Sequence, residues 1–177
     1  MRGLVFSRKG FSLIELIMVI VVVGIISVAV APIFFGGFQA FFTAKNFSGM
    51  NAQAELAMDR LAREIRGVDP SQDLDSATLP TASQLKFRLY NGTAQAAWVT
   101  YTLSGTNLMR NTDTLATGIS SLAFSYYKPD GTALTPPLTL AQAQGIWFVR
   151  ITVRAVGGSL SESLRTTIFL RSGPASR

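Results

Sequence analysis

The sequence contains no cysteine and no histidine among its 177 residues. The missing cysteines exclude disulfide bonds, thiolate metal sites and cysteine nucleophiles. The missing histidines remove the commonest general base and the commonest metal ligand. No carboxylate pair or glycine-rich phosphate loop in the sequence offers another catalytic centre. We therefore predict that the protein is not an enzyme, with no catalytic residue, no metal site and no cofactor.

Charged residues are also scarce, at 15% of the chain against 48% apolar residues. Sixteen basic and ten acidic residues give a net charge of +6. Three of the basic residues, Arg2, Arg8 and Lys9, lie close to the N-terminus, which leaves 13 basic against 10 acidic residues elsewhere. Because this remainder forms no basic stripe, we predict no nucleic-acid partner.

One long apolar run lies near the N-terminus. Residues 11–31 are 21 residues that carry a single charge, at Glu15. At about 1.5 Å per residue, a helix of this length crosses a hydrocarbon core of roughly 30 Å. The basic residues before it favour the cytoplasmic side, so we expect residues 1–10 in the cytoplasm and the rest beyond the membrane. The run therefore predicts a single-pass membrane protein.

Two simpler interpretations of this run remain open. A secretory signal peptide fits the basic start and the sequence Ala-Val-Ala at residues 29–31, which has the form of a cleavage site. Against it stand the length of the run, the carboxylate of Glu15, and Pro32 directly after the site, which hinders cleavage. A plain membrane anchor would tolerate Glu15, because the residue lies near the end of the run.

The start of the run resembles the processing site of type IV prepilins and of the related pseudopilins of type II secretion. Residues 8–16 read RKGFSLIEL. In that family a short basic leader is removed after a glycine, the new N-terminal residue is N-methylated, and the fifth mature residue is a glutamate. The corresponding residues here are Gly10, Phe11 and Glu15, and Pro32 stands where the family tends to place a helix-kinking proline. The resemblance implies prepilin peptidase, other pilin or pseudopilin subunits and an inner-membrane assembly platform as partners.

Glu15 needs a cationic partner in hydrocarbon, because an unpaired carboxylate is costly there. The methylated amine of Phe11 in a neighbouring subunit would supply one. Such an ion pair would set the axial register between subunits. After Pro32, the paired glycines Gly36 and Gly37 predict a stretch of helix that is kinked or locally melted.

An amphipathic helix is predicted to continue from this region to residue 68. Its apolar residues recur every three or four positions, the spacing of one helix face. Opposite charges four residues apart, such as Arg60 and Glu64, support the polar face. The apolar stripe is expected to pack on a sheet. The stripe consists of Phe47, Met50, Ala54, Met58, Leu61, Ile65 and Val68.

A loop rich in turn-forming residues follows, at residues 69–83. Its aspartates, Asp69, Asp73 and Asp75, suggest a calcium site, but their spacing matches no standard calcium loop. Solvated acidic residues of a loop are the commoner explanation.

The rest of the chain alternates apolar and polar residues with a period of two and predicts six strands. One long helix followed by strands joined by short turns implies an α+β fold, with the helix packed on a mostly antiparallel sheet. Residues 132–145 are expected to form a loop. The predicted strands cover residues 85–90, 97–103, 108–110, 115–127, 146–156 and 164–170.

A weaker resemblance covers this second part. The helix end RLAREIR, the pattern from Tyr101 to Arg110, and the segment GISSLAFSYYKPDG are similar to W-type minor pilins and J-type minor pseudopilins. Minor subunits prime assembly or occupy the filament tip. The absence of cysteine excludes the C-terminal disulfide loop that major pilins often carry, which favours a minor subunit.

We thus expect a structural, minor subunit of a type IV pilus or type II secretion pseudopilus, in the bacterial inner membrane and then in the filament. The alternative is a membrane-anchored periplasmic binding or adaptor domain outside any filament. The expected organisation is a leader (1–10), a transmembrane and filament-core helix (11–32), its amphipathic continuation (33–68), a β-rich domain (69–171) and a tail (172–177).

Overall fold

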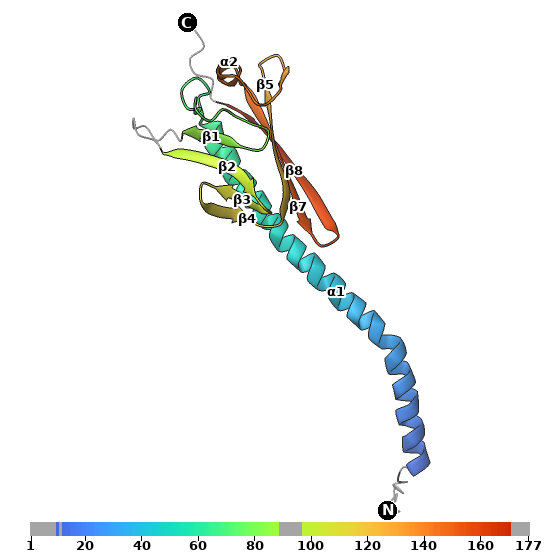
Figure 1. The fold of residues 1–177 in the computed structure, drawn as a ribbon. Coiled ribbons are helices and arrows are strands. Elements are labelled where there is room, and N and C mark those ends of the chain that lie inside the picture. The colour runs from blue at the N-terminus through green and yellow to red at the C-terminus, as the bar shows by residue number, and fades with distance from the viewer. Residues whose placement is uncertain (1–9, 11, 89–96, 171–177) are drawn as a thin grey trace, which may run out of the picture. The chain divides into compact units, whose positions relative to one another are not determined.

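A computed structural model describes residues 10, 12–88 and 97–170 of the chain. The chain divides into two compact units, Met1–Phe42 and Thr43–Arg177, and each is described by itself. Figure 1 shows the secondary-structure elements in chain order.

The helix α1 spans Leu13–Arg66, 54 residues in all. The predicted long helix is therefore confirmed, with ends that differ by two residues. Pro32, Gly36 and Gly37 all lie within continuous helix, so local melting of this stretch is not seen. A proline inside a helix removes one backbone hydrogen bond, and the turns on either side can persist. A kink at Pro32 stays a prediction.

Sheet A has four antiparallel strands in sequence order: β1 (Leu85–Arg88), β2 (Trp98–Ser104), β3 (Asn107–Arg110) and β4 (Asp113–Ala116). A two-residue turn joins β2 to β3, as the sequence predicts, and Gly105 in it has a φ of 59°. Part of the first predicted strand, residues 89 and 90, lies outside the described residues.

Sheet B is also antiparallel and has the order β6-β5-β7-β8. Its long strands β7 and β8 pair over ten positions without a shift of register. The elements are β5 (Ile119–Tyr127), β6 (Ala133–Leu134), β7 (Phe148–Gly157) and β8 (Leu160–Phe169).

The described residues thus form eight strands in two sheets, where the sequence predicted six strands and one sheet. The predicted strand 115–127 is two strands, β4 and β5, separated at Gly118. Gly118 has a φ of 72°, and a Cβ there would lie 1.6 Å from Cε of Met50 and 3.1 Å from the carbonyl oxygen of Val156. Only glycine combines this left-handed backbone with this close approach, and the turn carries the chain from one sheet to the other.

Two further boundaries differ. The predicted loop 132–145 contains β6 and a short helix, α2 (Leu140–Gln144), with a complete capping box between Thr139 and Gln142. The last strand begins at residue 160 rather than 164, because Gly158, with a φ of 63°, forms a tight hairpin turn after β7.

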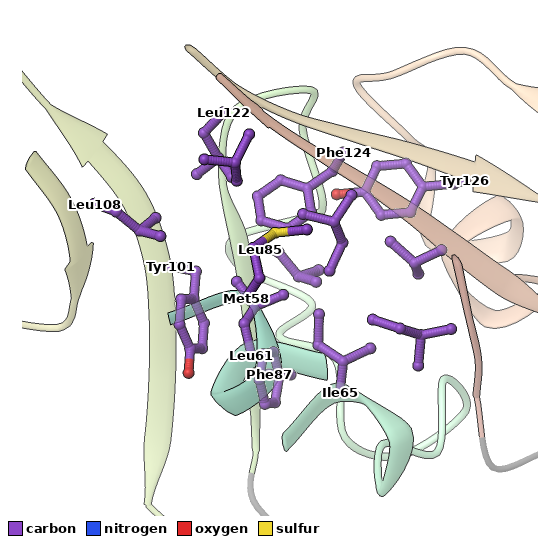
Figure 2. Packing of buried hydrophobic residues seen from close by; sticks show 14 of the residues in the cluster. Met58, Leu61, Ile65, Leu85, Phe87, Tyr101, Leu108, Leu122, Phe124 and Tyr126 are labelled. Carbon is purple, nitrogen blue, oxygen red and sulfur yellow. The ribbon is translucent and has the colours of Figure 1, made fainter. Parts of the chain in front are cut away.

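The C-terminal part of α1 packs on both sheets through one hydrophobic core. Figure 2 shows Met58, Leu61 and Ile65 of α1 among side chains of β1 and β5. The predicted helix stripe is buried from Ala54 to Val68, and Phe47 and Met50 are half-buried. The apolar side chains that alternate on one face of the predicted strands are mostly buried, among them Val99, Phe124 and Ile151. Leu103 and Leu164 are half-buried, and Trp147 is 37% exposed because it lies ahead of β7. An α+β fold is therefore confirmed.

Candidate functional site: the N-terminal segment

Gly10 is exposed, and a Cβ added to it would meet no atom within 4 Å. The described part of the chain therefore imposes no steric need for glycine at this position. A glycine that its own fold does not require is consistent with close approach by an external molecule, such as a peptidase at the backbone. Phe11 lies outside the described residues.

Ser12 caps the start of α1. The backbone N–H of Glu15 donates to Oγ of Ser12 at 3.3 Å, and the N–H of Leu16 donates to the carbonyl oxygen of Ser12 at 3.2 Å. Ser12-Leu13-Ile14-Glu15 has the S-x-x-E pattern of a capping box, a signal that our sequence analysis overlooked. Glu15 consequently sits in the first turn, where the positive end of the helix dipole favours a carboxylate.

Glu15 lines one end of an open, wholly apolar groove of about 250 Å³ on the surface of α1. The other residues of the groove are Met18, Val19, Val22 and Val23. No basic side chain in the described ranges forms an ion pair with Glu15. The helix thus carries a carboxylate residue beside an apolar surface. In an apolar environment such a carboxylate favours a cationic partner.

Within residues 10 and 12–42, no residue of the first unit is buried. Nineteen large apolar side chains between Leu13 and Phe42 are exposed, and the 18-residue window with the highest mean hydropathy, 3.0, has no buried residue. By length and composition, α1 is able to cross a membrane. Exposed apolar surface on this scale requires lipid or neighbouring protein to cover it.

The phenylalanines after Pro32 belong to the same exposed surface. Phe34, Phe35, Phe38, Phe41 and Phe42 are 56–70% exposed. Ile33, Gly37 and three of these rings line a second open groove of about 390 Å³. Because these rings are not packed in a core, they are available to lipid or to other proteins.

A polar network in the second unit joins α1 to sheet A. Oε2 of Glu64 accepts hydrogen bonds from the Tyr101 hydroxyl at 2.8 Å and from Nε of Arg110 at 3.0 Å. Oε1 of Glu64 accepts from Nε of Arg60 at 3.1 Å. Burial raises the pKa of the Glu64 carboxyl, but the hydrogen bonds from Arg110, Tyr101 and Arg60 outweigh it and hold the pKa below its ordinary 4.5. Glu64 is therefore a partly buried anion that links helix and sheet, beyond the solvated helix face that the sequence suggested.

The aspartates of the loop 69–83 are used within the loop. Oδ2 of Asp73 accepts from the N–H of Asp69 at 2.9 Å, and Oδ1 of Asp69 accepts from Ser71. Asp75 pairs with Lys86 at 2.7 Å. Within residues 10, 12–88 and 97–170, no group of three or more potential metal ligands comes together. These contacts support a structural role for the loop carboxylates.

Residues 6–31 match the model of the prokaryotic N-terminal methylation motif. The match covers 26 of the 177 residues and includes Gly10, Phe11 and Glu15. A comparison with curated proteins produced no match. The motif indicates a type IV pilin-like or pseudopilin-like protein that prepilin peptidase cleaves and methylates, and the long apolar helix fits its transmembrane anchor. Proteins with this motif serve structural roles.

Proposed function

We propose that this chain is a minor structural subunit of a type IV pilus or a type II secretion pseudopilus. The observation that carries the proposal is the coincidence of the methylation motif with a helix whose large apolar side chains are exposed. A leader of residues 1–10 is removed, and Phe11 becomes the methylated N-terminus. The helix, residues 11–32, then passes from the membrane into the filament core, and residues 33–68 continue it into the β-rich domain at 69–171, ahead of the tail at 172–177.

The route of the chain follows from its charge. The basic leader stays in the cytoplasm, and the helix crosses the bacterial inner membrane once. After cleavage, the assembly platform transfers the helix into a bundle of other subunits, where apolar neighbours replace lipid. The β-rich domain then lies in the periplasm or at the cell surface as part of the filament.

The assignment as a minor subunit rests on two observations. The chain has no cysteine for the C-terminal disulfide loop that major pilins often carry. Its resemblance to W-type and J-type subunits involves the helix end with Glu64 and the strand pattern from Tyr101 to Arg110. The side chains of Tyr101 and Arg110 both donate hydrogen bonds to Glu64. A network between helix and sheet gives a physical reason for such a pattern.

Cleavage after Gly10 tests the proposal first. Co-expressed with prepilin peptidase, the wild-type chain is expected to start at methylated Phe11, as read by intact mass and N-terminal sequencing. Gly10→Val is expected to stay uncleaved, because a β-branched side chain obstructs close approach to the backbone. Gly3→Val, in the same leader but away from the site, is the matched control and is expected to mature normally.

Other termini would overturn the proposal. A wild-type chain that still begins at Met1 with the peptidase present indicates a tethered binding or adaptor domain. A chain that begins at Pro32 indicates a secreted domain released by signal peptidase. Either result removes the filament subunit as an explanation.

Glu15 is proposed to act in assembly, through an ion pair with the Phe11 amine of a neighbouring subunit. Glu15→Ala is expected to mature after Gly10 and to remain in the membrane, yet to reach sheared filaments at a level lower by roughly tenfold or more, since it removes one member of an apolar-shielded pair. Quantitative immunoblotting of the filament and membrane fractions measures the ratio.

A control is needed because Glu15 also stands in the capped first turn. Ser12→Ala removes the cap hydrogen bond and keeps the carboxylate, so its incorporation should remain near the wild-type level. Equal losses in Ser12→Ala and Glu15→Ala would assign Glu15 to helix capping instead.

A further inference from the structure

The outer edge of β8 is long and lacks a paired strand among the described residues. Over its ten residues β8 pairs with β7, and no strand in the described ranges pairs with its other side. The remaining sheet edges are short: β4 has four residues, β6 has two, and β1 has four with a bridge from Leu74 to Phe87. Proteins usually protect a long edge, because its free backbone groups pair readily with another strand.

The strand carries few of the features that block such pairing. The sequence LSESLRTTIF contains no proline, glycine or lysine, and its register against β7 has no bulge. Its charges are Glu162 and Arg165, one of each sign. An edge of this length without blocking features marks a site for strand addition.

The register identifies the free backbone groups. Gly157 pairs with Leu160 across a two-residue turn, and such a closing pair is hydrogen-bonded, so hydrogen-bonded pairs recur at every second residue. The N–H of Leu170 donates to the carbonyl oxygen of Trp147 at 3.0 Å, which agrees with even-numbered residues facing β7. The odd-numbered residues therefore direct their N–H and C=O groups outward. They are Ser161, Ser163, Arg165, Thr167 and Phe169.

Two side chains of this set define what an added strand should carry. Arg165 is exposed, and it shares the outer face of sheet B with Arg150 and Arg154, while no acidic residue stands on that face of β5, β7 or β8. Phe169 is 61% exposed and lies 5.4 Å from the ring of Phe148. Cross-strand partners are favourable when charges are opposite and when aromatic side chains meet apolar ones.

We propose that the β8 edge accepts an extended strand from a neighbouring, non-identical subunit of the filament. The added strand carries an acidic residue opposite Arg165 and, four positions away on the same face, a large apolar residue beside Phe169. Backbone hydrogen bonds to the odd-numbered residues supply the affinity, and these two side chains supply the specificity. This inference rests on the function proposed above.

A second copy of this chain fits the edge poorly. Antiparallel pairing of β8 with its own copy about Arg165 would set two arginines against each other, which is repulsive. Such a pairing also needs a two-fold axis, whereas subunits of a polar filament all point in one direction. A strand from a different subunit meets neither obstacle.

Amide hydrogen exchange at single-residue resolution tests the proposal. The samples are the full mature chain in detergent, alone and co-purified with the pilin-like subunits encoded beside its gene. The amides of Ser163, Arg165 and Thr167 should exchange quickly in the chain alone and slow by roughly tenfold or more in the complex. The even-numbered amides of Leu164 and Thr166 should be protected in both samples.

Proline substitutions test the same edge by binding. Ser163→Pro and Thr167→Pro each remove one outward N–H and leave the bonds to β7 in place, a position where an edge strand tolerates proline. Each is expected to reduce co-purification of the partner subunits by roughly tenfold. Ser163→Ala and Thr167→Ala, which keep the N–H, should co-purify like the wild type.

The outcomes separate the two proposals. A chain that matures at Phe11 but shows unchanged exchange at the odd-numbered amides in the complex overturns strand addition and leaves the filament subunit standing. The same holds if no partner co-purifies, or if the proline variants bind normally. Where a proline variant fails to fold, the exchange pattern of the wild type decides. A chain that does not mature overturns both proposals.

Discussion

At the scale of single residues, Glu64 is the side chain that links α1 to sheet A by polar contacts. It is bonded to Arg60 within the helix and to Tyr101 and Arg110 of the sheet. Partly buried charges of this kind are stabilising only when their hydrogen bonds are satisfied, and both carboxylate oxygens of Glu64 accept hydrogen bonds here. The network fixes how the helix lies against β2 and β3.

Replacing Glu64 by glutamine is expected to lower the free energy of unfolding by about 1–3 kcal/mol, because Arg110 loses its anionic partner. Chemical unfolding of the full chain in detergent, followed by tryptophan fluorescence, measures the change, since both tryptophans lie in the second unit. Glu55→Gln, on an exposed position of the same helix, should change the stability by less than about 0.5 kcal/mol. Equal losses of stability in Glu64→Gln and Glu55→Gln would show that the hydrogen-bond network does not stabilise the fold.

The effect of Glu64→Gln should depend on pH. The pKa of Glu64 is lower in the folded chain than its ordinary 4.5, so the carboxylate contributes stability above that value. This contribution is lost as the pH falls from 4.5 through the lower pKa of the folded state. The difference in stability between wild type and Glu64→Gln should therefore be largest near neutral pH and shrink below pH 4.5. A difference that stays constant through that range contradicts an anionic Glu64.

At the scale of elements, α1 has two parts with different surroundings. The large side chains between Leu13 and Phe42 are exposed, whereas Ala54, Met58, Leu61 and Ile65 are buried against the sheets. The two parts of this helix therefore need different surroundings. Its first part needs an apolar environment, and its second part supplies the core of a folded domain.

Two leucines of α1 provide a matched test of this division. Leu61 is fully buried, and Leu61→Ala is expected to lower the free energy of unfolding by about 2–5 kcal/mol through lost contacts and a cavity. Leu56 is 70% exposed, and Leu56→Ala should cost less than about 0.5 kcal/mol. Chemical unfolding of the two variants measures the difference in stability between them. Similar losses would mean that the helix does not present the described face to the sheets.

Periodicity located the elements better than their boundaries. The alternation in residues 115–127 and 146–156 predicted strands where β5 and β7 lie, because one face of each is buried and the other is open. The break between β4 and β5 was missed, because the local pattern does not show the left-handed backbone of Gly118 or its close approach to the carbonyl oxygen of Val156, which is distant in sequence. The capping pattern of Thr139 and Gln142 is present in the sequence, but it lies in a segment with two prolines, which favours the prediction of a loop.

At the scale of the whole molecule, the core lies entirely within the second unit. Every buried apolar residue of the described chain falls between Ala54 and Leu170. A domain with its own contiguous core is able to fold by itself. The first unit contributes exposed apolar surface and no part of this core.

A chain shortened to residues 43–177 is therefore expected to stay soluble without detergent and to unfold cooperatively. The full chain is expected in the membrane fraction, because its exposed apolar helix favours hydrocarbon. Fractionation, followed by thermal unfolding of the soluble form, measures both. Aggregation of the shortened chain, or unfolding without a cooperative transition, would show that the second unit depends on the first.

The N-terminal helix, its motif and the class of fold were predictable without coordinates, since these depend on local composition, spacing and periodicity. The motif residues Gly10, Phe11 and Glu15 are recognisable because they stand at fixed distances along one segment. The folded chain alone shows that the strands form two sheets, that Tyr101 and Arg110 donate to Glu64, and that no strand in the described ranges covers the outer edge of β8. These features join residues far apart in the chain, and pairing at that range depends on packing that no local pattern encodes.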